Sequence, residues 1–92
     1  MEFEWDKEKA KANFKKHGVS FEEAELAFDD ENGVEFLDEF NSVEEIRYRL
    51  IALSPARLLF VSFTIRDSEI IRLISARKAT PIEREIYNES RK

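Results

Sequence analysis

Cationic side chains on the predicted strands could bind a phosphate. Arginine offers a planar, permanently charged fork that makes two-point contacts with phosphate oxygens. Arg47, Arg66 and Arg72 come from three neighbouring predicted strands, and Arg77 and Lys78 follow at the end of the last one. Adjacent strands lie about 4.8 Å apart, so side chains from three of them can converge on one phosphodiester. The sequence therefore predicts an anion-binding site on a sheet.

The last predicted strand, residues 70–76, is flanked by arginines. Successive side chains of a strand point to opposite faces, and five positions separate Arg72 from Arg77. We therefore expect their two guanidinium groups on opposite faces. Arg77 lies where the chain turns toward Thr80 and can re-aim, which makes it the better catalytic candidate.

A second polar set lies on the first predicted helix. Lys9, Asn13, Lys16 and His17 recur at i, i+4, i+7 and i+8, which places them on one helical face. Two ammonium groups, an amide and an imidazole could bind a phosphate, and the imidazole can exchange protons near neutral pH. Alternatively, the lysines are solvated and His17 helps to end the helix.

Acidic residues precede the arginines in the chain. Residues 22–46 contain eleven Asp and Glu without any Lys or Arg, whereas residues 47–78 contain seven basic residues and two acidic ones. The net charge of −5 conceals this division. The arginines therefore bind an anion or pair with the preceding acids, and both interpretations stay open. The run 29–31 could gather a hard cation, but no ligand spacing supports it, and we predict neither a metal nor a cofactor.

Capping residues predict the helices. Asp6 is a suitable N-cap for a helix over 7–16, and Gly18 fits the left-handed position that ends it. Ser20 and Glu23 form a capping box, so a second helix begins at residue 21. A second capping box at residues 80–83, with proline at the first helical position, opens a last helix that runs to about residue 90.

Alternating apolar residues predict the strands. The strongest signals are at 34–37, 45–53, 58–66 and 70–76, and a short strand-like segment precedes the first helix. The order predicts an α+β fold, in which two N-terminal helices and one C-terminal helix pack on one face of a small antiparallel meander of three or four strands. At 92 residues the chain forms a single domain, residues 1–92.

Composition excludes several classes of protein. A hydrophobic content of 42% with eight Phe favours a folded core over disorder. The chain has no cysteine, so disulfides and thiolate-bound zinc are excluded. The N-terminus lacks the apolar run of a signal peptide, and the longest apolar stretch, 58–61, is too short to span a bilayer. We therefore expect a cytoplasmic protein.

Motifs at both ends of the chain resemble the BrnT toxin family. The opening motif comprises residues 3–6, Lys9-Ala10, Asn13 and 16–24, and the closing motif comprises Arg72, 74–80, Glu83-Arg84 and Tyr87. Arg47-Tyr48 and residues 50–54 match the middle of the family pattern. The resemblance therefore covers nearly the whole chain.

The resemblance implies a RelE-like ribonuclease toxin of a type II toxin–antitoxin pair, which cleaves RNA and stops translation. Its partner would be a BrnA-like antitoxin with a ribbon-helix-helix part, and the complex of the two would bind operator DNA. The competing interpretation is a non-catalytic homologue that acts as a co-repressor or protein-interaction module.

Metal-free RNA cleavage needs a base for the 2′-OH, an acid for the leaving oxygen and cations around the phosphate. We assign phosphate stabilisation to Arg66, Arg72 and Arg77. We assign proton transfer to His17, and Lys9 or Lys16 could act in its place if burial lowers the pKa of that lysine. The remaining candidate RNA contacts are Asn13, Arg47 and Lys78.

Overall fold

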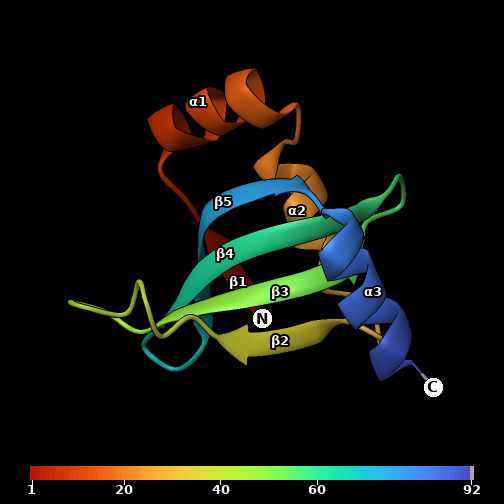
Figure 1. The fold of residues 1–92 in the computed structure, drawn as a ribbon. Coiled ribbons are helices and arrows are strands. Elements are labelled where there is room, and N and C mark those ends of the chain that lie inside the picture. The colour runs from red at the N-terminus through yellow and green to blue at the C-terminus, as the bar shows by residue number, and fades with distance from the viewer. Residues whose placement is uncertain (92) are drawn as a thin grey trace.

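The computed structural model describes residues 1–91, which form one five-stranded sheet and three helices (Figure 1). The strands are β1 (Glu2–Glu4), β2 (Val34–Leu37), β3 (Arg47–Leu53), β4 (Leu58–Arg66) and β5 (Ile70–Lys78), and the helices are α1 (Lys7–His17), α2 (Phe21–Ala27) and α3 (Pro81–Ser90). Their order in the sheet is β1-β5-β4-β3-β2. Within residues 1–91, no helix has the length and apolar character needed to cross a membrane.

The sheet differs from the predicted meander in one strand. β2 to β5 pair antiparallel as expected, but β1 adds a fifth strand that runs parallel to β5 and makes the sheet mixed. This strand pairs only with Ile70 to Arg72, at the start of β5. Such a pairing joins the two ends of the sequence, and local patterning carries no signal for it.

Each helix begins where its capping residues predict. The Asp6 carboxylate accepts from the N–H groups of Glu8 and Lys9, and Gly18 ends α1 with a φ of 70°. Thr80 and Glu83 form a reciprocal capping box at the start of α3, with Pro81 in the first turn. The last helix therefore begins only four residues after Arg77, the last arginine of β5.

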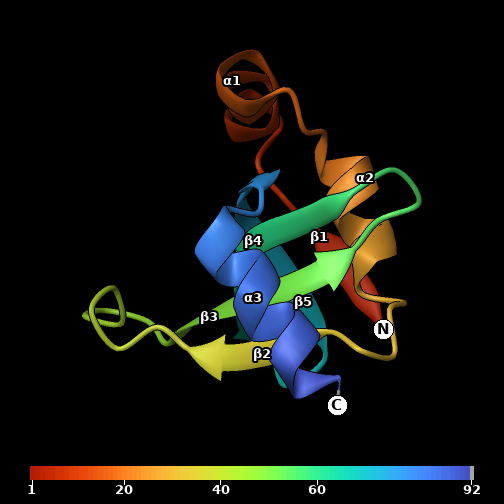
Figure 2. The ribbon, with the colours of Figure 1, turned by 45° about the vertical axis from the view of Figure 1, so that its right-hand side comes forward.

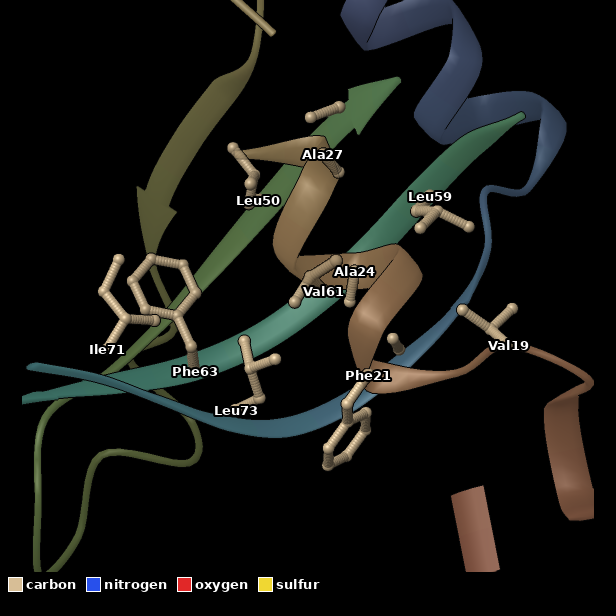
Figure 3. Packing of buried hydrophobic residues seen from close by; sticks show 12 residues of the cluster. Val19, Phe21, Ala24, Ala27, Leu50, Leu59, Val61, Phe63, Ile71 and Leu73 are labelled. Carbon is tan, nitrogen blue, oxygen red and sulfur yellow. The ribbon is translucent and has the colours of Figure 1, made fainter. Parts of the chain in front are cut away.

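The main core lies on one face of the sheet under α2 (Figure 3). Phe21, Ala24 and Ala27 form the buried stripe of this helix, as their spacing predicts, and none is accessible to solvent. They pack with alternate residues of β4 and β5, among them Phe63 and Leu73. Burial of each large apolar side chain contributes roughly 1.5–3 kcal/mol.

A second, smaller cluster lies on the opposite face under α3 (Figure 2). Tyr87 of α3 packs there with Ile51, Leu58 and Phe60, whose neighbours along β3 and β4 belong to the main core. The Tyr87 hydroxyl donates to Asp30 Oδ2 at 2.6 Å, which ties α3 to the loop after α2. The helices therefore cover both faces, and the prediction that all three pack on one face is wrong.

Asn13 joins α1 to the edge of β5. Its Nδ2 donates to the carbonyls of Val19 and Ala76 at 2.9 and 2.8 Å, and its Oδ1 accepts from the N–H of Ala76 at 3.1 Å. β1 does not extend this far along β5, so the buried amide takes the place of a neighbouring strand. Both donor hydrogens are used, and the prediction that Asn13 binds phosphate is wrong for this geometry.

Candidate functional site

Five arginines project from the face of the sheet opposite the main core. Directly paired residues of neighbouring strands point to the same face, and so do alternate residues of one strand. On β4 this face carries Phe60, Ser62, Thr64 and Arg66. Arg47 and Arg72 pair with Thr64, while Arg49 pairs with Ser62 and Arg77 with Phe60. We call these residues the arginine face: Arg47, Arg49, Arg66, Arg72 and Arg77.

A β-bulge brings Arg72 and Arg77 to the same face. Phe63 pairs with Leu73, but the next residue back along β4, Ser62, pairs with Ser75, which leaves Ile74 without a cross-strand partner. One extra residue shifts the alternation of β5 by one. Five positions therefore separate two side chains on one face, and the prediction of opposite faces is wrong.

Two guanidinium groups lie against one aromatic ring at the α3 end of this face. The Cζ atoms of Arg49 and Arg77 are 4.9 and 4.3 Å from the centroid of the Phe60 ring. Arg49 also donates from Nε to Asp38 Oδ2 at 2.7 Å and from Nη1 to Ser62 Oγ at 2.6 Å. The ring and these hydrogen bonds hold both cations in defined positions.

Glu83 holds Arg77 from the other side. Arg77 donates from Nη1 and Nη2 to the two carboxylate oxygens of Glu83, both at 2.8 Å. Although burial acts to raise it, the hydrogen bonds from Arg77 and from the Thr80 N–H keep the pKa of the Glu83 carboxyl below its usual range. The charge of Arg77 is therefore balanced by a partner that is itself fixed at the start of α3.

Arg66 and Arg72 share a single carboxylate at the opposite end of the face. Glu4 Oε2 lies 3.7 Å from Arg66 Nε and 2.8 Å from Arg72 Nη1. Arg47 has a looser ion pair with Glu45 at 3.8 Å, and its buried Nε donates no hydrogen bond within residues 1–91. The five arginines of this face therefore pair with four carboxylates. The excess positive charge lies beside Glu4, which pairs with two arginines.

The alternative that the arginines pair with residues 22–46 is confirmed for part of the set. Arg47 and Arg49 pair with acids of that segment, and so does Arg57, which lies outside the arginine face. Arg57 donates to both oxygens of Glu23 at 2.9 and 2.8 Å and to the Gly18 carbonyl. This bidentate contact lowers the pKa of Glu23 and fixes the turn between α1 and α2.

A pocket of about 420 Å³ opens beside the arginine face. It lies where β2 continues into the loop 38–46, which protrudes from the sheet in both ribbon views (Figures 1 and 2). The lining residues come from β2, this loop and the neighbouring strands: Phe36, Leu37, Asp38, Glu39, Phe40, Arg49, Phe60 and Arg77. Aromatic rings and paired charges therefore line one concave surface.

The structure assembles only some of the predicted site residues. Arg47, Arg66, Arg72 and Arg77 share the arginine face, whereas Lys78 pairs with Leu59 and points to the opposite face. The other predicted residues belong to α1, where Lys9 and Lys16 are exposed and His17 is half-buried at the helix end. Within residues 1–91 the His17 side chain makes no hydrogen bond or ion pair.

Sequence reasoning missed Arg49 and Phe60 as site residues. The alternation that assigns Arg47 to one face of β3 assigns Arg49 to the same face, so the signal for Arg49 was present. Phe60 gave no signal, because it lies in a run of apolar residues on β4 in which both faces are buried.

The fold and the arginine face define a small α+β protein with a cationic sheet surface. Residues 5–83 match the family described as the ribonuclease toxin BrnT of type II toxin–antitoxin systems. The chain therefore belongs to the BrnT family, as its end motifs predict. A type II family implies an antitoxin partner.

A solved structure supports this assignment. The fold is similar to the crystal structure of the Brucella abortus ribonuclease toxin BrnT, with a TM-score of 0.69 and 25% sequence identity. The match covers 87% of this chain and 97% of the Brucella chain. No curated protein matches the sequence.

Proposed function

We propose that this chain is an endoribonuclease toxin that cleaves RNA in the cytoplasm and thereby inhibits translation, without a metal ion. The observation that carries the proposal is the arginine face, on which five guanidinium groups from three strands surround a floor that includes Ser62 and Thr64. The phosphate group, a monoanion in the substrate, approaches a dianion in the transition state of cleavage, and fixed cations stabilise the added negative charge. The family description supports the same activity.

Each group has a proposed role. Arg66, Arg72 and Arg77 stabilise the phosphate, and Arg47, whose side chain is 38% exposed, contacts the RNA backbone. His17 remains the proposed proton-transfer group. Lys9 and Lys16, which are exposed, and Lys78 are proposed as further RNA contacts. RNA would have to reach from the arginine face to α1 for these α1 residues to act.

The proposed partner is a BrnA-like antitoxin with a ribbon-helix-helix part, which neutralises the toxin and carries the complex to operator DNA. The fold relationship that we propose beyond the family is to RelE-like toxins. The family description supports the existence of an antitoxin.

A specific observation favours a second function. Every arginine of the arginine face has a carboxylate within 4 Å, and such pairing opposes phosphate binding. A non-catalytic homologue that binds its antitoxin as a co-repressor accounts for this. Expression without a partner should arrest bacterial growth if the chain is a nuclease and should be tolerated if it is a co-repressor.

The decisive experiment incubates the purified chain with RNA in the presence of EDTA. We expect cleavage, and we expect Arg77→Ala to reduce its rate by roughly a hundredfold. Arg84→Ala is the matched control, because Arg84 is an exposed arginine of α3 outside the arginine face. Absence of cleavage by the folded wild-type chain, or equal loss in both variants, would contradict the proposal.

A further inference from the structure

The pocket of about 420 Å³ beside the arginine face has a set of groups that suits a nucleic-acid base. We propose that it binds one unpaired guanine base of a single-stranded RNA, next to the phosphates held by the arginine face. The inference rests on the proposed function for the class of ligand, RNA. The volume of the pocket is within the usual range of small-molecule sites.

The charges of the pocket favour a base over a phosphate. Both of its cations are balanced, Arg49 by Asp38 and Arg77 by Glu83. Hydrogen bonds from Asn41 and Arg49 lower the pKa of Asp38, so its carboxyl stays ionised and keeps Arg49 neutralised. A neutral ring adds no charge to this environment, whereas a phosphate would lie near the acidic groups, among them Glu39.

The aromatic residues of the pocket provide a stacking surface. Phe36 and Phe40 are 40% and 94% exposed, so their rings are available to a ligand. Phe60 is only 9% exposed and lies 6.3 Å from Phe36, measured between ring centroids, so it supports the exposed ring from below. Single-stranded RNA is bound in this way, by unstacked bases on aromatic side chains.

Glu39 determines the base specificity of the pocket. It lines the pocket and makes no hydrogen bond or ion pair within the described part of the chain. A carboxylate accepts two hydrogens side by side. Guanine presents two adjacent donors, N1–H and the N2 amino group, on its Watson–Crick edge, whereas each other base places an acceptor beside its donor. A free carboxylate therefore selects guanine.

The position of the pocket fits a continuous RNA path. Arg49 and Ser62 are cross-strand partners at its edge, and Thr64 is two residues further along β4. Beyond Thr64, Arg66 and Arg72 share Glu4 and carry the excess positive charge. A base in the pocket thus places the adjacent phosphates over the arginine face.

The test measures binding to RNA that cannot be cut. We would titrate the full chain, in EDTA, into 2′-O-methyl hexauridine and into hexamers with a single G, A or C, and follow fluorescence anisotropy. The G hexamer should bind roughly tenfold more tightly than the others. Phe36→Ala should weaken all hexamers, whereas Glu39→Gln should remove only the preference for G.

Two matched controls accompany these variants. Glu35→Gln removes a charge from β2 on the face opposite Phe36, and Phe14→Ala removes an exposed phenylalanine from α1. Equal affinity for all hexamers, or unchanged binding by Phe36→Ala and Glu39→Gln, would overturn the guanine pocket. Binding of a lysine- and arginine-rich peptide at Phe36 without RNA binding would also overturn it, in favour of a protein contact.

The outcomes separate the two proposals. Selective binding of the G hexamer by a chain that cuts no natural RNA would remove the nuclease and retain the pocket. Cleavage of natural RNA that is insensitive to Phe36→Ala and Glu39→Gln would retain the nuclease and remove the pocket.

Discussion

Arg77 and Glu83 are joined by two parallel hydrogen bonds of 2.8 Å, and the same carboxylate accepts the Thr80 N–H at the start of α3. Glu83 therefore has two functions at once, because it completes a capping box and orients a candidate catalytic cation. Any change at Glu83 should affect both the stability of α3 and the charge that Arg77 presents to an anion.

Glu83→Gln should separate these two functions. Glutamine keeps an oxygen for the Thr80 N–H, so the helix start is retained, but the ionic partner of Arg77 is lost. We expect RNA affinity to rise by roughly two- to tenfold at low salt, while the free energy of unfolding falls by about 1 kcal/mol. Anisotropy with 2′-O-methyl RNA and urea unfolding measure the two effects.

The lowered pKa of Glu83 makes a contribution to the pH dependence of wild-type stability that the Glu83→Gln variant lacks. A lowered pKa contributes stability above the unfolded value, and this contribution is lost as pH falls through the folded value. Stability of the wild-type chain should therefore decrease more steeply below about pH 4.5 than that of Glu83→Gln. Glu85→Gln, on an exposed position of α3, should behave like the wild type.

A Glu83→Gln variant with unchanged RNA affinity would show that Arg77 does not contact RNA.

Asn13→Ala should reduce stability without changing RNA affinity. The substitution removes three buried hydrogen bonds and leaves the N–H and carbonyl of Ala76 without their partner. We expect a loss of about 2–4 kcal/mol in the free energy of unfolding, measured by urea unfolding. Lys15→Ala, an exposed change on the same helix, should have almost no effect. A specific loss of RNA affinity in the folded Asn13→Ala variant would restore Asn13 as a phosphate ligand.

Tyr87→Phe should change stability in a pH-dependent way. Burial and the hydrogen bond to Asp30 raise the pKa of Tyr87 to about 12. A raised pKa contributes stability that is fully present below the unfolded value of about 10 and is lost as pH rises toward 12. At pH 8 the variant should be less stable by about 1 kcal/mol.

The measurement compares the free energy of unfolding of the wild type and of Tyr87→Phe at alkaline pH. The difference between wild type and Tyr87→Phe in urea unfolding should shrink between pH 10 and pH 12, because only the wild type loses the protonated hydroxyl. Lysine titration affects both proteins equally and cancels in the difference. A difference that stays constant over this range would contradict a buried Tyr87–Asp30 hydrogen bond.

Ser68→Gly should stabilise the turn between β4 and β5. Asp67 and Ser68 both have positive φ, 51° and 66°, a conformation that favours glycine. We expect the melting temperature to rise, which corresponds to a gain of about 0.5–1 kcal/mol. Ser68→Ala retains the Cβ atom and should give no such gain. Equal melting temperatures for the glycine and alanine variants would contradict the assigned turn.

Local signals predicted the elements, but long-range pairing decided the site. Capping residues such as Asp6 and Thr80 define helix starts within four residues of sequence, and the alternation in β3 assigns Arg47 and Arg49 to one face. The pairing of β1 with β5 depends on residues about 68 positions apart. No local pattern reports such a contact, which also decides that Glu4 pairs with Arg72.

Local sequence patterns also do not show which face of the sheet α3 covers. A run such as Leu58 to Val61 is apolar at every position, so alternation does not show which residues meet α2 and which meet α3. The Asp30 hydrogen bond that positions Tyr87 joins a turn to a helix 57 residues later. The acidic turn at residues 29–31 therefore anchors α3 through Asp30.

Ile74 has no cross-strand partner on β4. We therefore expect β5 to accept a change in length at Ile74 and at no other position. A chain without Ile74 would keep both cross-strand neighbours of the bulge and would still place Arg77 opposite Phe60. A deletion at Ala76 would instead place Lys78 opposite Phe60 and replace the bidentate fork by a single ammonium group. The bulge decides which side chains at the end of β5 point to the arginine face. We therefore expect insertions and deletions among BrnT relatives to be accepted at the bulge and rejected between the bulge and α3.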